Sequence, residues 1–226
     1  MEFSFDGIGS AAQSMSPAAI PTGHNNKGFF KRALMNLFII AFMFGFVELY
    51  TFCLGSGNGL IGLTISLAII SFWRTDIGIK PLQGAFVIWG SFLLTGGATF
   101  LASFHPAIGV FVNFASIYII LTLTSHQPMA KAYYPILSCY LFAQSSPVYG
   151  IDYGLRMIGI AGGGLIVAII YYMRHRKVKR RRNITDIFRE THFCSIRTKF
   201  FIRLTTGLTI AMLIGDFFHV LKPAWI

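Results

Sequence analysis

The chain has 226 residues, of which 54% are apolar and only 12% are charged, whereas an average soluble domain has about 25% charged residues. The apolar residues gather in runs of about twenty, the length of helix that spans the hydrocarbon core of a bilayer. These features exclude a soluble globular enzyme, a disordered protein and a secreted disulfide-rich domain. The three cysteines lack metal-ligand spacing, so we expect no cofactor, no metal site and no disulfide.

The position of the positive charge indicates a membrane rather than nucleic acid as its partner. The net charge is +11, and 11 of the 19 Lys and Arg fall between Arg174 and Arg203, directly after an apolar run. Membrane proteins keep such clusters on the cytoplasmic side. The residues before Lys27 include Glu2 and Asp6 and no basic segment, so we expect no cleavable signal peptide.

Seven apolar segments are predicted to form helices, six before the basic run and one after it. They lie at 33–54, 57–73, 81–104, 106–123, 132–149, 155–173 and 200–221. The second and the fifth are the weakest, since the second has a Gly-rich entry and the fifth contains Pro135, Gln144, Ser145 and Pro147. Either of them could be broken or re-entrant, which is tolerated where protein or a water-filled cavity covers the freed backbone.

Lys and Arg in alternate loops support an all-α polytopic membrane protein with a cytoplasmic N-terminus. One side of the membrane receives 17 of them and the other receives only Arg156 and Lys222, as the positive-inside rule requires. We expect a polar cytoplasmic tail at 1–28, a six-helix transmembrane domain at 29–173 and a basic cytoplasmic linker at 174–199. The first helix of a second repeat would occupy 200–226.

The second repeat is inferred from two similar segments. They read FFKRALMNLFIIAFMFGFVEL from Phe29 and FFIRLTTGLTIAMLIGDFF from Phe200, and share a double Phe, a basic residue, an apolar run and a late acid, Glu48 or Asp216. Six intervening crossings would make these parallel repeats, an arrangement found in some transporters. Because the second copy has scarcely begun at Ile226, we expect a truncated or split form of a longer protein.

Three segments carry a resemblance to a known family. They are the short second crossing GSGNGLIGLTISLAIISF, the sixth crossing GLRMIGIAGGGLIVAIIYYMRHRK, and RTKFFIRLTTGLTIAMLIGDFFHVLKPAWI, which ends in a Pro223 to Trp225 turn. Together they resemble the fusaric acid resistance and aromatic acid exporter superfamily of bacterial inner-membrane proteins. The resemblance implies export of organic anions, especially aromatic carboxylic acids, sometimes with a periplasmic adaptor protein. This chain departs from the larger members in having only a basic linker after the sixth helix.

Three polar residues are the candidates for substrate binding: Arg156, Gln144 and Ser145. A guanidinium pairs bidentately with a carboxylate, and Arg156 matches the position of the family's arginine. The alternative for Arg156 is an interfacial anchor whose charged end reaches the headgroups. Gln144 and Ser145 either line a pathway or bond neighbouring helices.

Two carboxylates, Glu48 and Asp216, are the candidates for proton coupling, because a carboxylate in an apolar run needs a cation or a proton. The alternative places both at the outer interface, in contact with water. The glycines at 159, 162, 163 and 164 are interpreted as helix-packing positions.

The leading hypothesis is therefore a proton-driven exporter of organic anions and not an enzyme. Its partners would be membrane lipids, the substrate, a second half-chain or another copy of the chain, and an adaptor protein, with no nucleic acid. The alternative is a non-transporting membrane scaffold or subunit that recruits partners or anionic lipid through the basic linker. The scaffold hypothesis predicts that Arg156, Glu48 and Asp216 are dispensable.

Overall fold

The structure, a computed structural model, describes residues 26–124, 132–178, 182–189 and 196–217. Most of the predicted N-terminal tail, Cys194 and the turn from Pro223 to Trp225 lie outside the described residues. Every regular element within the described ranges is a helix. The prediction of an all-α polytopic membrane protein is confirmed.

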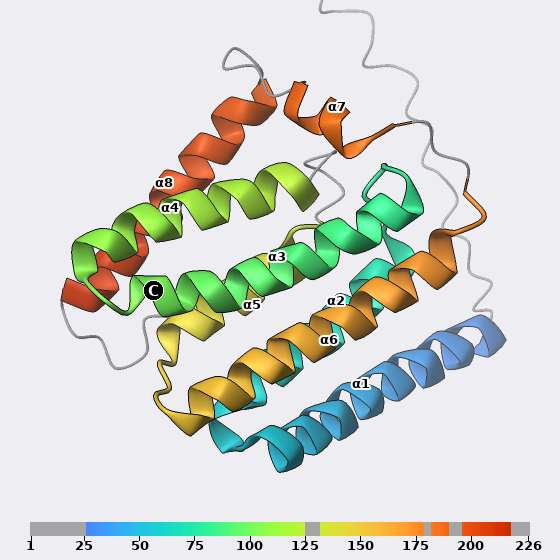
Figure 1. Cartoon of the computed structure of the whole chain (residues 1–226). Helices are drawn as coiled ribbons and strands as arrows, with labels where there is room; N and C mark the ends of the chain where they lie inside the picture. The colour runs from blue at the N-terminus through green and yellow to red at the C-terminus, as the bar shows by residue number, and fades with distance from the viewer. Residues whose placement is uncertain (1–25, 125–131, 179–181, 190–195, 218–226) are drawn as a thin grey trace, which may run out of the picture. The chain divides into compact units, whose positions relative to one another are not determined.

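Eight α-helices and one short 3-10 helix are described (Figure 1). Their bounds are α1 Asn26–Leu54, η1 Ser56–Asn58, α2 Gly59–Arg74, α3 Pro81–Ala102, α4 Pro106–Thr124, α5 Tyr134–Ser145, α6 Ile151–His175, α7 Ile184–Arg189 and α8 Ile196–Phe217. Six of these stretches are long and apolar enough to cross a membrane, namely α1, η1 with α2, α3, α4, α6 and α8. The weak second segment is thus long and apolar enough for a full span.

The fifth predicted crossing is broken, which is one of the two forms that its sequence allows. Its helix, α5, has 12 residues and is about 18 Å long, whereas a bilayer core is about 30 Å thick. The chain then runs without helix from Ser146 to Gly150. Pro147 disfavours helical backbone in the residue before it, and Gly150 takes a φ of +63°, which favours glycine. Five long spans and one short helix therefore precede the basic segment.

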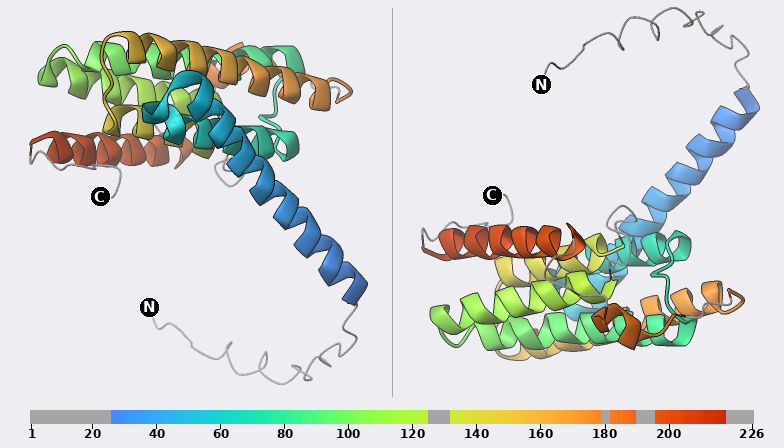
Figure 2. Two further views of the ribbon diagram at one scale, coloured as in Figure 1. Left: turned by 90° about the horizontal axis from the view of Figure 1, so that it is seen from below. Right: turned by 90° about the horizontal axis from the view of Figure 1, so that it is seen from above.

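The chain divides into two compact units, with the boundary after Ile40 inside α1. In the second unit α3 packs against α6 and α4, α2 packs against α6 and α5, and α8 packs against α4. The two views in Figure 2 and the view in Figure 1 place α3 and α6 side by side in one layer, with α2, α5 and α8 behind them.

Close contact between α3 and α6 depends on glycine, as the sequence predicts. A Cβ atom on Gly164 would lie 2.6 Å from the Cβ of Phe92, and one on Gly84 would lie 2.6 Å from the ring of Tyr171. The two pairs show that α3 and α6 are antiparallel. Gly162, by contrast, faces open space, so the packing role predicted for the glycines does not extend to it.

Segments predicted to share the cytoplasmic side meet at one end of the second unit. The Tyr171 hydroxyl, near the end of α6, donates to Asp76 Oδ1 in the α2–α3 connection at 2.7 Å. The Lys80 N–H donates to the carbonyl of Arg182 at 3.1 Å. The α2–α3 connection, the end of α6 and the start of the α7 segment therefore lie together, which fits an even number of passes between the α2–α3 connection and the end of α6.

The predicted basic linker at 174–199 contains more structure than the sequence indicates. It includes the end of α6, all of α7 and the first residues of α8, which begins at Ile196 rather than at 200. Arg197 extends α8 because its guanidinium lies 5.3 Å from the ring centroid of Phe201 and donates to the carbonyl of Thr122 at 3.1 Å. Hydropathy does not detect such a basic first turn.

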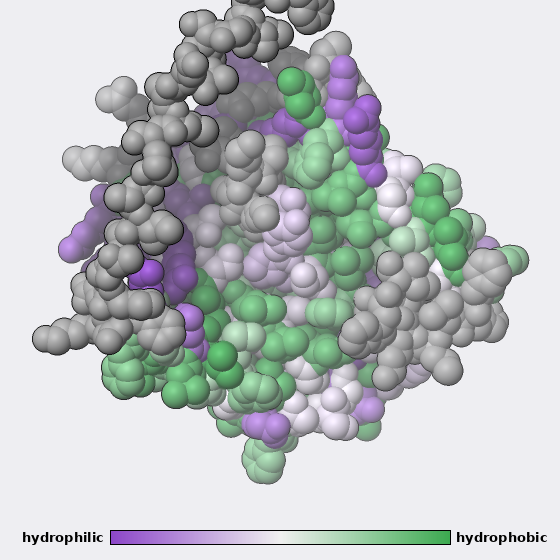
Figure 3. Space-filling view, turned by 180° about the vertical axis from the view of Figure 1, so that it is seen from behind, coloured by the Kyte–Doolittle hydropathy of each residue, from purple (hydrophilic) through white to green (hydrophobic). Residues whose placement is uncertain are grey.

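The surface of the helices suits lipid. Large apolar side chains are exposed along several spans, for example Phe111 at 77% and Ile158 at 66%. Hydrophobic side chains cover much of the face seen in Figure 3, and strongly hydrophilic ones lie mostly toward its margins. Exposed apolar area on this scale is unfavourable in water and favourable against hydrocarbon.

Candidate functional site

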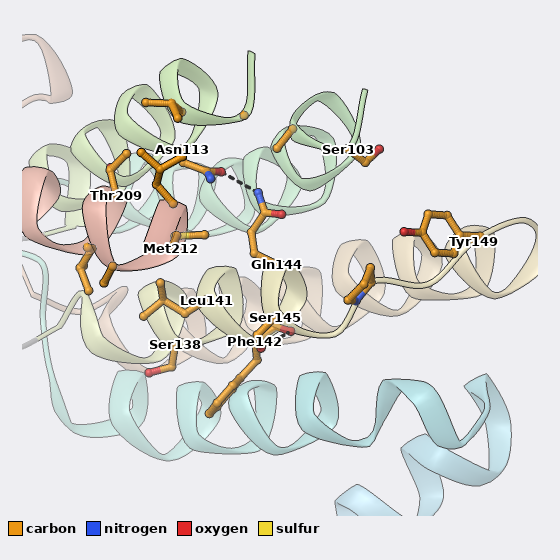
Figure 4. Close-up of a pocket in the computed structure, with 17 residues that line it drawn as sticks. Ser103, Asn113, Ser138, Leu141, Phe142, Gln144, Ser145, Tyr149, Thr209 and Met212 are labelled. Carbon is orange, nitrogen blue, oxygen red and sulfur yellow. Dashed lines mark hydrogen bonds between the residues drawn. The ribbon is translucent and has the colours of Figure 1, made fainter. Parts of the chain in front are cut away.

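A pocket of about 430 Å³ lies between α4, α5, α8 and the end of α3 (Figure 4). Its volume is within the range of small-molecule sites. None of its 17 lining residues is Asp, Glu, Lys, Arg or His. The lining combines apolar side chains with neutral polar ones, which include Ser103, Asn113, Ser138, Gln144, Ser145 and Thr209.

Two side-chain amides meet at the pocket and leave hydrogen-bonding capacity unused. Asn113 Oδ1 accepts from the Tyr140 hydroxyl and from Gln144 Nε2, both at 2.6 Å. Figure 4 shows the contact between the amides of Asn113 and Gln144 as a dashed line. Among the described residues, Asn113 Nδ2 and Gln144 Oε1 have no hydrogen-bond partner. One donor group and one acceptor atom therefore remain for a ligand.

Thr209 of α8 adds a third unused group. It is 5% exposed, and its hydroxyl has no hydrogen-bond partner among the described residues. Threonines in helices commonly donate to the carbonyl four residues back, as Thr95 and Thr124 do at 3.0 Å and 2.6 Å. The hydroxyl of Thr209 does not, and its oxygen is buried although the residue lines the pocket.

Arg156 lies outside this pocket lining and binds backbone instead. It is 2% exposed, and all its hydrogen-bond partners in the described structure are neutral oxygens. Nε donates to Asn58 Oδ1 at 2.8 Å and Nη2 donates to the carbonyl of Gly57 at 2.9 Å, both in η1. Nη1 donates to the carbonyls of Ala143 and Ser146 at the end of α5.

The carbonyls held by Arg156 need external donors because they lie where helices end. Backbone acceptors at helix ends have no intrahelical partner, and in a membrane water does not replace it. Arg156 thus joins η1 to the end of α5 and to α6. The carbonyls of Ala143 and Ser146 lie on either side of Gln144 and Ser145 in the chain, so Arg156 fixes the backbone that carries these two pocket residues.

The predicted site residues are only partly brought together. Gln144 and Ser145 both line the pocket, although the Ser145 hydroxyl donates to the carbonyl of Phe142 at 3.2 Å. Glu48 is exposed on α1. Asp216 lies in α8, but its side chain is outside the described part of the structure. Anion binding by Arg156 and proton coupling by the two acids stay predictions.

Asn58, Asn113 and Thr209 were not predicted from the sequence. Asn113 is a lone amide in an apolar run, a signal that could have marked it. Asn58 lies in a Gly-rich stretch, where it donates to the carbonyl of Leu54 at 2.7 Å while it accepts from Arg156. Thr209 carries no signal in sequence, because a helical threonine normally satisfies its own hydroxyl.

A comparison with protein-family models, with curated proteins and with solved structures found no match to this chain. The family resemblance drawn from the sequence therefore stays a prediction.

Proposed function

We propose that the protein is a transporter of small amphipathic organic molecules and that the pocket between α4, α5 and α8 is its substrate site. The observation that carries the proposal is the pair of unused hydrogen-bonding groups in this pocket, on Asn113 and Gln144. They lie within a protein whose described helices include six long and apolar enough to span a membrane.

The composition of the pocket fits a binding site for a small molecule. A concave site with an apolar lining and a few convergent polar groups is the usual form of a small-molecule site. Here Leu141, Phe142 and Met212 supply apolar surface beside the polar groups.

The substrate class and the direction of transport rest on the family resemblance. We take organic acids with an aromatic ring as the first substrates to test, exported across a bacterial inner membrane with the N-terminus in the cytoplasm. Proton coupling is not part of the proposal, because Glu48 is not among the pocket residues and the side chain of Asp216 lies outside the described part of the structure.

Blocking the pocket tests the proposal. Cells that express the full chain are loaded with labelled aromatic acids, and efflux is compared for wild type, Ala211→Phe and Ile210→Phe at equal membrane abundance. Ala211 lines the pocket, whereas its neighbour Ile210 is 50% exposed and does not line it. We expect Ala211→Phe to abolish efflux and Ile210→Phe to leave it unchanged.

The result also separates the transporter from the membrane scaffold. A wild-type chain that moves none of the acids faster than membranes without it would contradict transport of this substrate class and favour the scaffold. Equal efflux by Ala211→Phe and wild type would show that the pocket is not the substrate site.

A further inference from the structure

We infer that the pocket between α4, α5 and α8 binds its ligand in an electrically neutral form, which for a weak acid is the undissociated carboxylic acid. The inference rests on the proposed function and specifies which chemical species occupies the site. It follows from the charge of the lining and from the donors and acceptors that the lining leaves unused.

The described lining offers no counter-ion. The 17 residues that the structure shows there carry neither a cation nor an anion, and Arg156 directs four hydrogen bonds to oxygens of the protein itself. Transfer of an ionised carboxylate from water to an apolar site without a paired charge is far more costly than transfer of a neutral group. An uncharged ligand avoids this cost.

The unused groups fit a ligand that both donates and accepts. Asn113 Nδ2 is a donor, Gln144 Oε1 is an acceptor and the Thr209 hydroxyl can be either. An undissociated carboxyl group or a carboxamide places a carbonyl oxygen against the donor and an O–H or N–H against the acceptor. A carboxylate has acceptors only, so one of its oxygens would face Gln144 Oε1 without a proton between them.

Titratable groups around the pocket are few. Tyr149 lines it and Tyr140 lies behind Asn113. His105 precedes α4 and is exposed. Asp216 lies seven residues after Thr209 in α8, and its side chain is outside the described part of the structure.

Matched aromatic probes separate charge from shape. Binding of labelled benzamide to the full chain in lipid nanodiscs is measured at pH 5 and pH 7, with benzoic acid, benzenesulfonate and benzamidinium as competitors. We expect benzamide to bind equally at both pH values. Benzoic acid, with a carboxyl pKa of about 4, should compete about 90-fold more weakly at pH 7 than at pH 5. Benzenesulfonate and benzamidinium, charged at both pH values, should not displace benzamide.

A pair of threonines on α8 provides the residue-level test. Thr205 and Thr209 both have buried hydroxyls without a partner among the described residues, but only Thr209 lines the pocket. Thr209→Val should weaken benzamide binding about threefold to tenfold, the value of one neutral hydrogen bond. Thr205→Val should leave the affinity unchanged.

The outcomes distinguish the inference from the function on which it rests. Displacement of benzamide by benzenesulfonate or benzamidinium, or competition by benzoic acid that is flat between pH 5 and pH 7, would overturn the neutral-ligand inference and leave the transporter standing. Equal loss of affinity in both threonine variants would remove Thr209 from the site. Failure of every probe to bind would overturn both the inference and the assignment of the pocket as a substrate site.

Discussion

Replacement of Arg156 by alanine should destabilise the protein strongly without any contact with substrate being lost. The side chain is almost fully buried and donates four hydrogen bonds to oxygens of η1 and the end of α5. In Arg156→Ala these acceptors lose their donor, and the cavity left by the side chain has no ordered group to take its place. Because Arg156 joins three segments, the loss is expected to affect global unfolding rather than one helix end.

The size of the effect follows from the number and type of bonds. A hydrogen bond to a charged group contributes about 1.5 to 3 kcal/mol, so simple addition over the four bonds would give about 6 to 12 kcal/mol. Bonds in one network are not additive, and the variant also avoids the cost of burying a charge. Each buried acceptor left without a donor costs about 1 to 3 kcal/mol, and because these costs overlap within one network we expect a net loss of about 3 to 5 kcal/mol. Arg156→Lys should recover less than half of it, since a lysine cannot reproduce the planar fork.

The measurement is the free energy of unfolding in mixed micelles with increasing SDS. Arg174→Ala is the matched control, because Arg174 lies on the same helix, is exposed and lies 5.6 Å from the ring centroid of Trp73. That variant should lose less than about 1 kcal/mol. A loss of less than about 1 kcal/mol in Arg156→Ala, the size expected for an exposed charge, would refute the structural role. Normal stability with lost efflux would instead support anion binding by Arg156.

Two further predictions concern packing and topology. Gly164→Ala should lower the free energy of unfolding by about 1 to 3 kcal/mol, because its Cβ would collide with α3. Gly162→Ala, whose Cβ would meet open space, should be neutral or stabilising by up to about 1 kcal/mol. Equal losses in the two variants would contradict the packing of α6 against α3. A reporter fused at Lys177 should lie in the cytoplasm and one fused at Ser103 should lie outside it. The start of α3 packs at the end of α6, so Ser103, which follows the end of α3, lies at the opposite end of the two helices from Lys177. Both reporters on the same side would contradict this arrangement of the helices.

The fold was predictable because its main signal is local. Long apolar runs predict the helices, and Lys and Arg in alternate loops predict on which side of the membrane each loop lies. The break in the fifth segment was visible as Pro135 and Pro147, but proline alone does not say whether a helix kinks or ends. The early start of α8 was hidden because it depends on contacts of Arg197 with α4 and with the next turn.

The site was less predictable because its partners are backbone atoms and distant side chains. Arg156 stood out as a charge in an apolar run, yet its acceptors include three carbonyls, and a carbonyl has no signature in sequence. Gln144 was marked by its polarity, but its contact with Asn113, 31 residues earlier, needed the tertiary structure. Residue type thus indicates that a buried polar group requires partners and does not identify them.

The chain order of the partners of Arg156 bears on how the protein is assembled in the membrane. All four acceptors come from residues 57, 58, 143 and 146 and so precede Arg156. During synthesis the segments that carry them leave the ribosome before α6 does. An unaccompanied arginine in an inserting helix costs about 2.5 to 3.5 kcal/mol, but here the oxygens that bind it are already synthesised when α6 arrives. Circular permutation that moved α6 ahead of η1 and α5 would remove this advantage while leaving every contact of the finished structure in place.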